Sequence, residues 1–127
     1  METNFRKTPR LFKVGLKNQI TIKDFGDISL EEDEQVTFNT KSGAKYDFTK
    51  KNWGFYATQS INKRLINEGF KTALVSNRMN HIYIMVVEVK FLNLFKEYCE
   101  VENQKILIWL DDETQVNKIF NKCLPTN

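Results

Sequence analysis

The feature that most restricts the fold is a pair of apolar segments, residues 72–76 and 81–88, joined by the short segment NRMN. Both are rich in Leu, Val, Ile and Tyr, a composition typical of β-strands. In the second segment, HIYIMVVE, nearly every position is apolar instead of every other one. Such a run is typical of a strand covered on both faces. We therefore predict a hairpin at the core of a sheet, with both faces of its second strand buried.

The first third of the chain shows the alternation of apolar and polar residues that predicts half-buried strands. Four segments carry it: residues 11–16, 20–25, 35–40 and 44–49. The first two are joined by residues 17–19, and the last two by the Lys-Ser-Gly turn at residues 41–43. Short connections of this kind join antiparallel neighbours. The pattern predicts an antiparallel β-meander.

Apolar residues switch to helical spacing after residue 90. Phe91, Leu94, Phe95 and Tyr98 predict an amphipathic helix from Lys90 to about Asn103. Residues 105–110 read as one more buried strand. Asp112 and Gln115 form a capping-box-like start to a last helix. That helix carries a stripe of Val116, Ile119, Phe120 and Cys123 and ends at Pro125.

The order of these elements predicts an α+β fold, mainly an antiparallel sheet that begins with the N-terminal β-meander and carries about three helices. The length of 127 residues fits one domain. With 41% hydrophobic residues, five Gly and two Pro, the composition excludes disordered and repetitive chains. We predict a single domain over residues 10–124 and a flexible N-terminal arm over residues 1–9.

Composition also restricts location and cofactors. The longest strongly apolar run, Ile82–Val87, is too short to cross a bilayer, so we expect no membrane span. Cys99 and Cys123 show no CxxC spacing and no signal-peptide pattern is seen, which favours a cytoplasmic location. With His81 as the only histidine, the chain lacks the ligands of a zinc site. Glycine-rich nucleotide-binding motifs are absent, and we expect no cofactor.

The candidate ligand site lies in the stretch Lys50–Phe70, which mixes aromatic, polar and basic residues. Its first part, with Trp53, Phe55 and Tyr56, reads as the end of an extended segment. A helix should follow, roughly from Gln59 to Glu68, with Thr58 or Ser60 as its cap and Gly69 at its end. Ile61, Leu65, Ile66 and Phe70 are spaced for its buried side.

Two cations fall at the start of that predicted helix, where the helix dipole disfavours positive charge. A bound anion would reverse this penalty, and hydroxyl and amide groups lie nearby. The alternative is that these residues are ordinary caps and solvated side chains. The predicted ligand-binding residues are Trp53, Tyr56, Thr58, Gln59, Ser60, Asn62, Lys63 and Arg64.

Two other classes of function stay open. Trp53, Phe55 and Tyr56 lie among Lys50, Lys51, Lys63 and Arg64, a mixture that can stack bases and meet phosphates in a nucleic-acid-binding module. A small enzyme acting on a phosphorylated or carboxylated substrate is the third class.

The sequence favours a non-enzymatic protein over that third class. His81 has no evident catalytic partner. The acidic triplet Asp111–Glu113 suits a helix start better than a Mg²⁺ site. We therefore predict no catalytic residue and no bound metal.

Three strings resemble small, largely uncharacterised bacterial proteins from surface-polysaccharide biosynthesis loci: TPRLFKVG, EQVTFNTKSGAKYDFTKKNWGFYATQSINKRL and ILIWLDD. The resemblance covers residues 8–113 and carries no catalytic motif. It implies a cytoplasmic accessory role near sugar-nucleotide or glycan chemistry. Sugar nucleotides and sugar phosphates combine an anion with ring faces that could stack on Trp53 or Tyr56. Expected partners are thus an anionic small molecule or a protein, including a second copy through the last helix or an unpaired edge strand.

Overall fold

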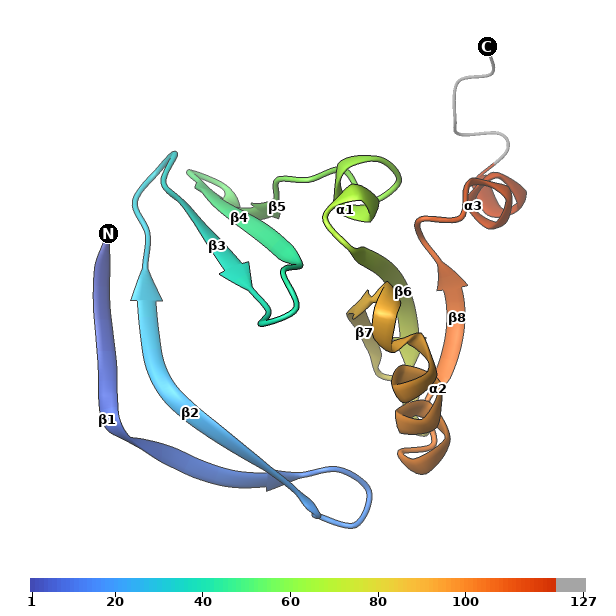
Figure 1. Ribbon diagram of the computed structural model, residues 1–127, viewed down its shortest axis with the longest axis horizontal. Coiled ribbons are helices and arrows are strands. Elements are labelled where there is room, and N and C mark those ends of the chain that lie inside the picture. The colour runs from blue at the N-terminus through green and yellow to red at the C-terminus, as the bar shows by residue number, and fades with distance from the viewer. Residues whose placement is uncertain (121–127) are drawn as a thin grey trace. The chain divides into compact units, whose positions relative to one another are not determined.

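A computed structural model describes residues 1–120 of the chain (Figure 1). The predicted α+β fold with antiparallel strands is confirmed, but the strands form three sheets, β1-β2, β3-β4-β5 and β7-β6-β8, where we expected one. A short 3₁₀ turn, Val89–Phe91, precedes α2. The elements are β1 Glu2–Val14, β2 Ile20–Ser29, β3 Gln35–Asn39, β4 Lys45–Lys51, β5 Gly54–Ala57, α1 Arg64–Asn67, β6 Phe70–Ser76, β7 Ile82–Glu88, α2 Leu92–Val101, β8 Lys105–Trp109 and α3 Glu113–Phe120.

Contacts within the chain group its residues into two compact units. The first comprises residues 1–37 and 47–58, and the second comprises residues 38–46 together with the chain from residue 59 onward. Strands β3 and β4 each contribute residues to both units. The predicted features Cys123 and Pro125 lie outside the described residues. Within residues 1–120, no helix is long and apolar enough to cross a membrane.

The first unit begins with the long hairpin of β1 and β2. Residues 2–9, which we expected to form a flexible arm, belong to β1. Glu2–Phe5 pair with Gly26–Ser29, and the pairing resumes at Arg10 opposite Asp24. Pro9 falls in the irregular segment between these two runs, where its missing N–H leaves no ladder position unfilled. A polar stretch that ends in proline is typical of a loose arm, but pairing with β2, which lies later in the chain, makes this segment a strand.

Asp24 holds this irregularity in place. Its carboxylate accepts hydrogen bonds from the Gly26 N–H at 2.9 Å and from the Arg10 guanidinium at 3.0 and 3.2 Å. Arg6 adds an ion pair at 3.3 Å. Gly26 has a φ of +121°, and a Cβ there would lie 2.0 Å from the Asn4 carbonyl oxygen. The two strands can therefore approach at this point only because residue 26 is glycine.

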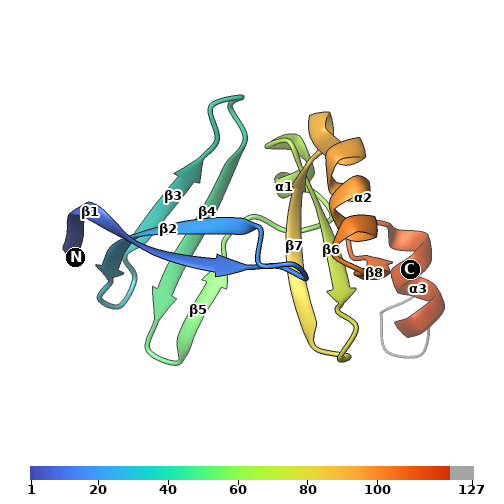
Figure 2. The ribbon, with the colours of Figure 1, turned by 90° about the horizontal axis from the view of Figure 1, so that it is seen from below.

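The second unit is built around β6, which lies between β7 and β8 (Figure 2). Both faces of β6 are covered, since Thr72, Ala73 and Val75 are fully buried. Phe70, at the start of β6, forms a core cluster with Ala44 and Leu65. The predicted hairpin, amphipathic helix, last strand and last helix all form in this unit.

One expectation about the hairpin is wrong. β7 was predicted to be buried on both faces, yet Ile82, Tyr83 and Ile84 are exposed. The reason is its place in the sheet: β7 is an edge strand and β6 is the central one. An apolar run predicts a strand, but it does not say whether that strand is central.

Replacing Gly26 with alanine should disrupt the β1-β2 hairpin. The new Cβ would meet the backbone of β1, and the positive φ adds strain of about 1–3 kcal/mol. We expect amides of residues 2–5 and 26–29 to exchange with solvent much faster than in the parent protein. Gly54→Ala is the matched control, because Gly54 has a φ of +144° with nothing within 4 Å of its Cβ position. Equal effects of the two changes on these amides would contradict the conclusion that the close approach of β1 and β2 requires glycine at residue 26.

Acid should weaken the same region by protonating Asp24. Hydrogen bonds from the Gly26 N–H and the Arg10 side chain lower the pKa of this carboxyl. A lowered folded-state pKa gives stability that is complete above the ordinary value of about 3.9 and is lost as pH falls through the folded value. NMR titration of the Gly26 amide should follow this loss. In Asp24→Asn, which carries no charge at any pH, the acid transition of Gly26 should vanish.

Candidate functional site

Trp53 and Tyr56 form an exposed pair of stacked rings in the first unit. Lys51 pairs with Gly54, so Asn52 and Trp53 make a two-residue turn that carries the indole at its tip. The ring centroids lie 6.1 Å apart with 26° between the planes. Trp53 is 68% exposed and Tyr56 is 42% exposed. Other aromatic side chains are exposed as well, but Trp53 is the most exposed of those in residues 1–120, and covering its face would be favourable.

Phe55 lies on the opposite face of the same hairpin. Neighbouring strand residues point to opposite faces, so Phe55 and Tyr56 diverge. Phe55 pairs with Lys50, whose Nζ lies 5.6 Å from the ring centroid, and the ring is 57% exposed. Both faces of the β4-β5 hairpin thus present aromatic rings, and only the Phe55 face has a cation over its ring.

Thr58 belongs to a polar cluster beside the stacked rings and does not cap a helix. Its hydroxyl lies 2.6 Å from the Thr49 hydroxyl, and both lie within 3.1 Å of the Gln35 side-chain oxygen. Thr49 pairs with Tyr56, so it shares the face of that ring. Gln35 is exposed and also carries an amide N–H₂ group that can donate. Hydrogen-bonding groups therefore adjoin the stacked rings.

The helix predicted over Gln59–Glu68 is much shorter in the structure. α1 spans only Arg64–Asn67, and Lys63 before it has a φ of −134° and a ψ of −82°, far from helical values. Ser60 provides the side-chain hydrogen bond at the start of α1, since its hydroxyl accepts from the Arg64 N–H at 3.1 Å. Gly69 ends the helix with a φ of +98°, as predicted. A single helical turn has only a small dipole, which removes much of the physical basis for the predicted anion cradle.

The other predicted residues of the cradle also have partners in the second unit. Gln59 is only 2% exposed and donates from Nε2 to the Lys45 carbonyl at 3.2 Å, so it fixes the chain locally. Asn62 donates to Glu113 at 3.3 Å, and Lys63 forms an ion pair with the same carboxylate at 3.2 Å. Glu113 thus places a negative charge where an anion was expected. Arg64 is exposed, and no ion pair links it to another residue of the described range.

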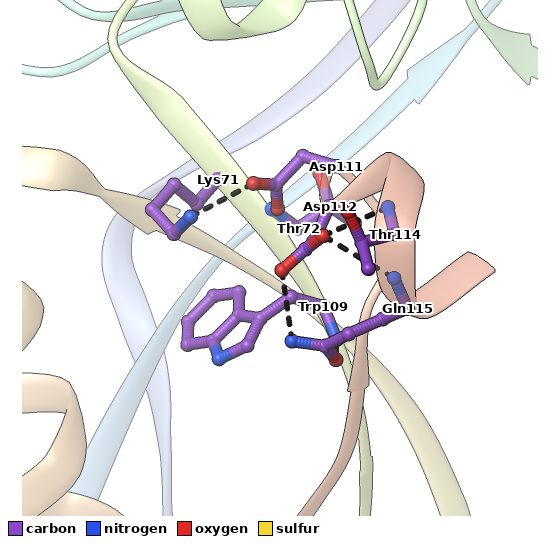
Figure 3. A network of polar contacts seen from close by, with 7 residues as sticks. All are labelled: Lys71, Thr72, Trp109, Asp111, Asp112, Thr114 and Gln115. Atoms are coloured by element: carbon purple, nitrogen blue, oxygen red, sulfur yellow. Dashed lines mark hydrogen bonds and ion pairs between the residues drawn. The ribbon is translucent and has the colours of Figure 1, made fainter. Parts of the chain in front are cut away.

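Two residues of the acidic triplet, Asp111 and Asp112, make structural contacts, as Figure 3 shows. Asp112 accepts from the N–H groups of Thr114 and Gln115, which confirms it as the cap of the last helix. The Gln115 side chain does not complete a capping box, because it donates to the Asp112 carboxylate and accepts from the Trp109 N–H instead of the Asp112 N–H. Asp111 accepts from the Thr72 N–H at 2.9 Å and from Lys71 at 2.8 Å. No cluster of three possible metal ligands occurs among residues 1–120.

Sequence reasoning missed an apolar groove of about 370 Å³ in the second unit. It lies along β7 and α2, and Glu88, Thr40 and Tyr98 supply its polar atoms; the remaining lining residues are Phe70, Met85, Val86, Val87, Phe91, Leu94 and Phe95. One signal could have revealed it. α2 carries two apolar stripes, Leu92, Phe95 and Cys99 on one side and Leu94, Tyr98 and Val101 on the other, which Phe91 extends in the turn before the helix. A helix packed on one face needs only one such stripe.

Removing the Asp111 carboxylate should destabilise the second unit. Its side chain is nearly buried, so Asp111→Ala leaves the Thr72 N–H and Lys71 without their acceptor. We expect the free energy of unfolding to fall by about 1–3 kcal/mol. Asp33→Ala, which breaks the exposed pair with Lys51, should change it by less than about 1 kcal/mol. Chemical denaturation of both variants measures the difference; equal values would contradict a structural role for Asp111.

The eight predicted site residues thus divide between the two units. Trp53, Tyr56 and Thr58 belong to the first, and the other five belong to the second. Of the surfaces that carry these residues, the hairpin face with the stacked rings, Thr49 and Gln35 best fits a ligand site, because exposed rings adjoin hydrogen-bonding groups there. Comparison of the chain with models of known protein families, with curated proteins and with solved structures finds no match.

Proposed function

We propose that this chain is a non-catalytic binding protein whose ligand stacks a sugar ring on Trp53 and Tyr56. The ligand class is a sugar phosphate or sugar nucleotide, and the setting is a cytoplasmic accessory role in surface-glycan synthesis. The exposed pair of stacked rings carries the proposal. An apolar sugar face that covers Trp53 removes both surfaces from water, which is favourable.

The polar cluster beside the rings supports the same class of ligand. A sugar presents hydroxyl groups around the edge of its ring, and these need donors and acceptors once they leave water. The exposed Gln35 amide adjoins this face: its oxygen accepts from the Thr58 hydroxyl and from the buried Thr49 hydroxyl, and its N–H₂ group can donate to a ligand. An aromatic platform with hydrogen-bonding groups at its side is the usual plan of a small polar ligand site.

Trp53→Ala provides the main test. A stacked ring contributes about 1–3 kcal/mol, so binding should weaken by about fivefold to 150-fold. The ligands are a panel of nucleoside diphosphate sugars, sugar phosphates and the corresponding neutral sugars, first screened by the rise in melting temperature of the parent protein. Isothermal titration then gives the affinity of each variant for the ligand that shifts it most.

Phe55→Ala is the matched control for this test. It removes an aromatic ring of similar exposure from the same hairpin, but from the opposite face. Sugar binding should therefore survive in Phe55→Ala. Equal loss in both variants, or no loss in Trp53→Ala, would exclude the stacked rings as the platform.

An anion site at Lys63 and Arg64 is tested separately, because these residues belong to the second unit. If they hold an anion, the double change to alanine should weaken the binding of inorganic phosphate. The ion pair of Lys63 with Glu113 works against this role. Unchanged phosphate binding would remove these two residues from the proposal and leave the stacked rings as its basis.

A nucleic-acid-binding module is the second candidate, and the exposure of Phe55 under Lys50 favours it. Rings on two faces of one hairpin can stack bases while lysines meet phosphates. In that case oligonucleotide affinity should fall steeply with salt and should also drop in Phe55→Ala. Salt-independent binding that survives Phe55→Ala would favour the sugar ligand instead.

A further inference from the structure

β7 has an unpaired backbone edge. It forms the outer strand of the β7-β6-β8 sheet and pairs only with β6, in an unbroken register from Phe70 opposite Glu88 to Ser76 opposite Ile82 (Figure 2). In an antiparallel ladder half of the N–H and C=O groups of an edge strand point outward. This edge is therefore a template for one more strand.

The strand lacks the features that normally block such pairing. Proteins protect an edge with proline, lysine, a bulge or a covering segment. The six residues Ile82–Val87 contain no charge, proline or glycine, and the register with β6 shows no bulge. Ile82, Tyr83 and Ile84 are exposed, Ile84 by 63%. The edge is thus open to pairing and attractive to an apolar neighbour.

The charges at the two ends of β7 indicate which partner fits. The turn before the strand carries the exposed Arg78, and the strand ends at Glu88, with the exposed Lys90 two residues beyond it. Two copies of β7 in antiparallel pairing would place each arginine end near the glutamate end of the other. Parallel pairing would instead bring like charges together. The uncharged middle and opposite ends therefore make the strand complementary to itself.

Glu88 is fixed by hydrogen bonds within its own unit. Its carboxylate accepts from the Thr40 hydroxyl at 2.8 Å and from the Ser42 hydroxyl. These hydrogen bonds, with Ser42 as the larger effect, lower the pKa of Glu88, so it is ionised at neutral pH. The Thr40 and Ser42 hydroxyls both donate to the same carboxylate oxygen, Oε1 of Glu88.

The apolar surface continues from β7 onto α2. The groove between them is lined by Met85 of the strand and by Phe91, Leu94 and Tyr98 of the exposed helix stripe. A pair of strands alone covers little side-chain surface, whereas a stable interface buries about 1,200–2,000 Å². The stripe on α2 supplies further apolar area adjoining the strand.

We propose that this chain forms a two-fold dimer in which β7 of one copy pairs antiparallel with β7 of the other. The two three-stranded sheets then become one six-stranded sheet in the order β8-β6-β7-β7-β6-β8. The exposed stripe of α2 flanks this junction in both copies. The dimer uses the second unit only, so it is independent of the ligand proposed for Trp53.

The test measures mass in solution by light scattering and sedimentation. The parent protein should behave as a species of twice the 15.0 kDa chain mass. Ile84→Lys places a charge at the middle of the edge and should yield single chains with an unchanged circular dichroism spectrum, because Ile84 is exposed. Arg78→Glu should weaken the dimer by bringing glutamates together. Leu11→Lys, which charges a residue 62% exposed on β1, should remain dimeric.

Hydrogen exchange gives a second readout that does not depend on mass alone. Amides of residues 82–87 should exchange more slowly in the parent protein than in Ile84→Lys, because the outward N–H groups are bonded only in the dimer. A parent protein that stays a single chain at the highest concentration at which it remains in solution would overturn the proposal. So would an Ile84→Lys variant that dimerises like the parent.

Discussion

The structure depends on the burial of β6 from every side. This strand pairs with β7 along one edge and β8 along the other, while Thr72, Ala73 and Val75 are removed from water. A buried backbone needs its hydrogen bonds satisfied, and two flanking strands achieve this. The polar contacts in Figure 3 join the same strand to the start of α3, because Asp111 accepts from the Thr72 N–H. Elements that follow β6 in the chain are thus positioned by it.

The burial of apolar side chains is uneven across the chain. Among the described residues, every fully buried hydrophobic side chain belongs to the second unit. In the first unit, Thr49 is the buried residue, and polar contacts around Asp24 and Gln35 shape the strands. Exposed aromatic and aliphatic side chains therefore remain in both units. Such surfaces favour association with a ligand or another chain, which links the two proposals to one physical cause.

The candidate site was only partly predictable. Trp53 and Tyr56 were identified because aromatic residues beside polar ones are conspicuous in any sequence. The helix meant to cradle an anion failed at Lys63, whose backbone angles interrupt it. Capping patterns indicate where a helix can start but not how far it continues, and here only the turn around the buried Leu65 is helical. Glu113, fifty residues later in the chain, contacts Lys63, and no local pattern announces such a contact.

Periodicity and capping chemistry were enough to identify the hairpin of residues 72–88, the amphipathic α2 and the Asp112–Gln115 cap, because each depends on residues close together in the chain. Partners distant in sequence set the rest. The pairing of residues 2–5 with Gly26–Ser29 turned an expected arm into a strand. β7 lies at the edge of its sheet, so part of an apolar run that composition alone predicts to be buried is exposed. Local patterns determine which elements form, whereas their neighbours in space determine which faces are buried, since burial is a property of the whole arrangement.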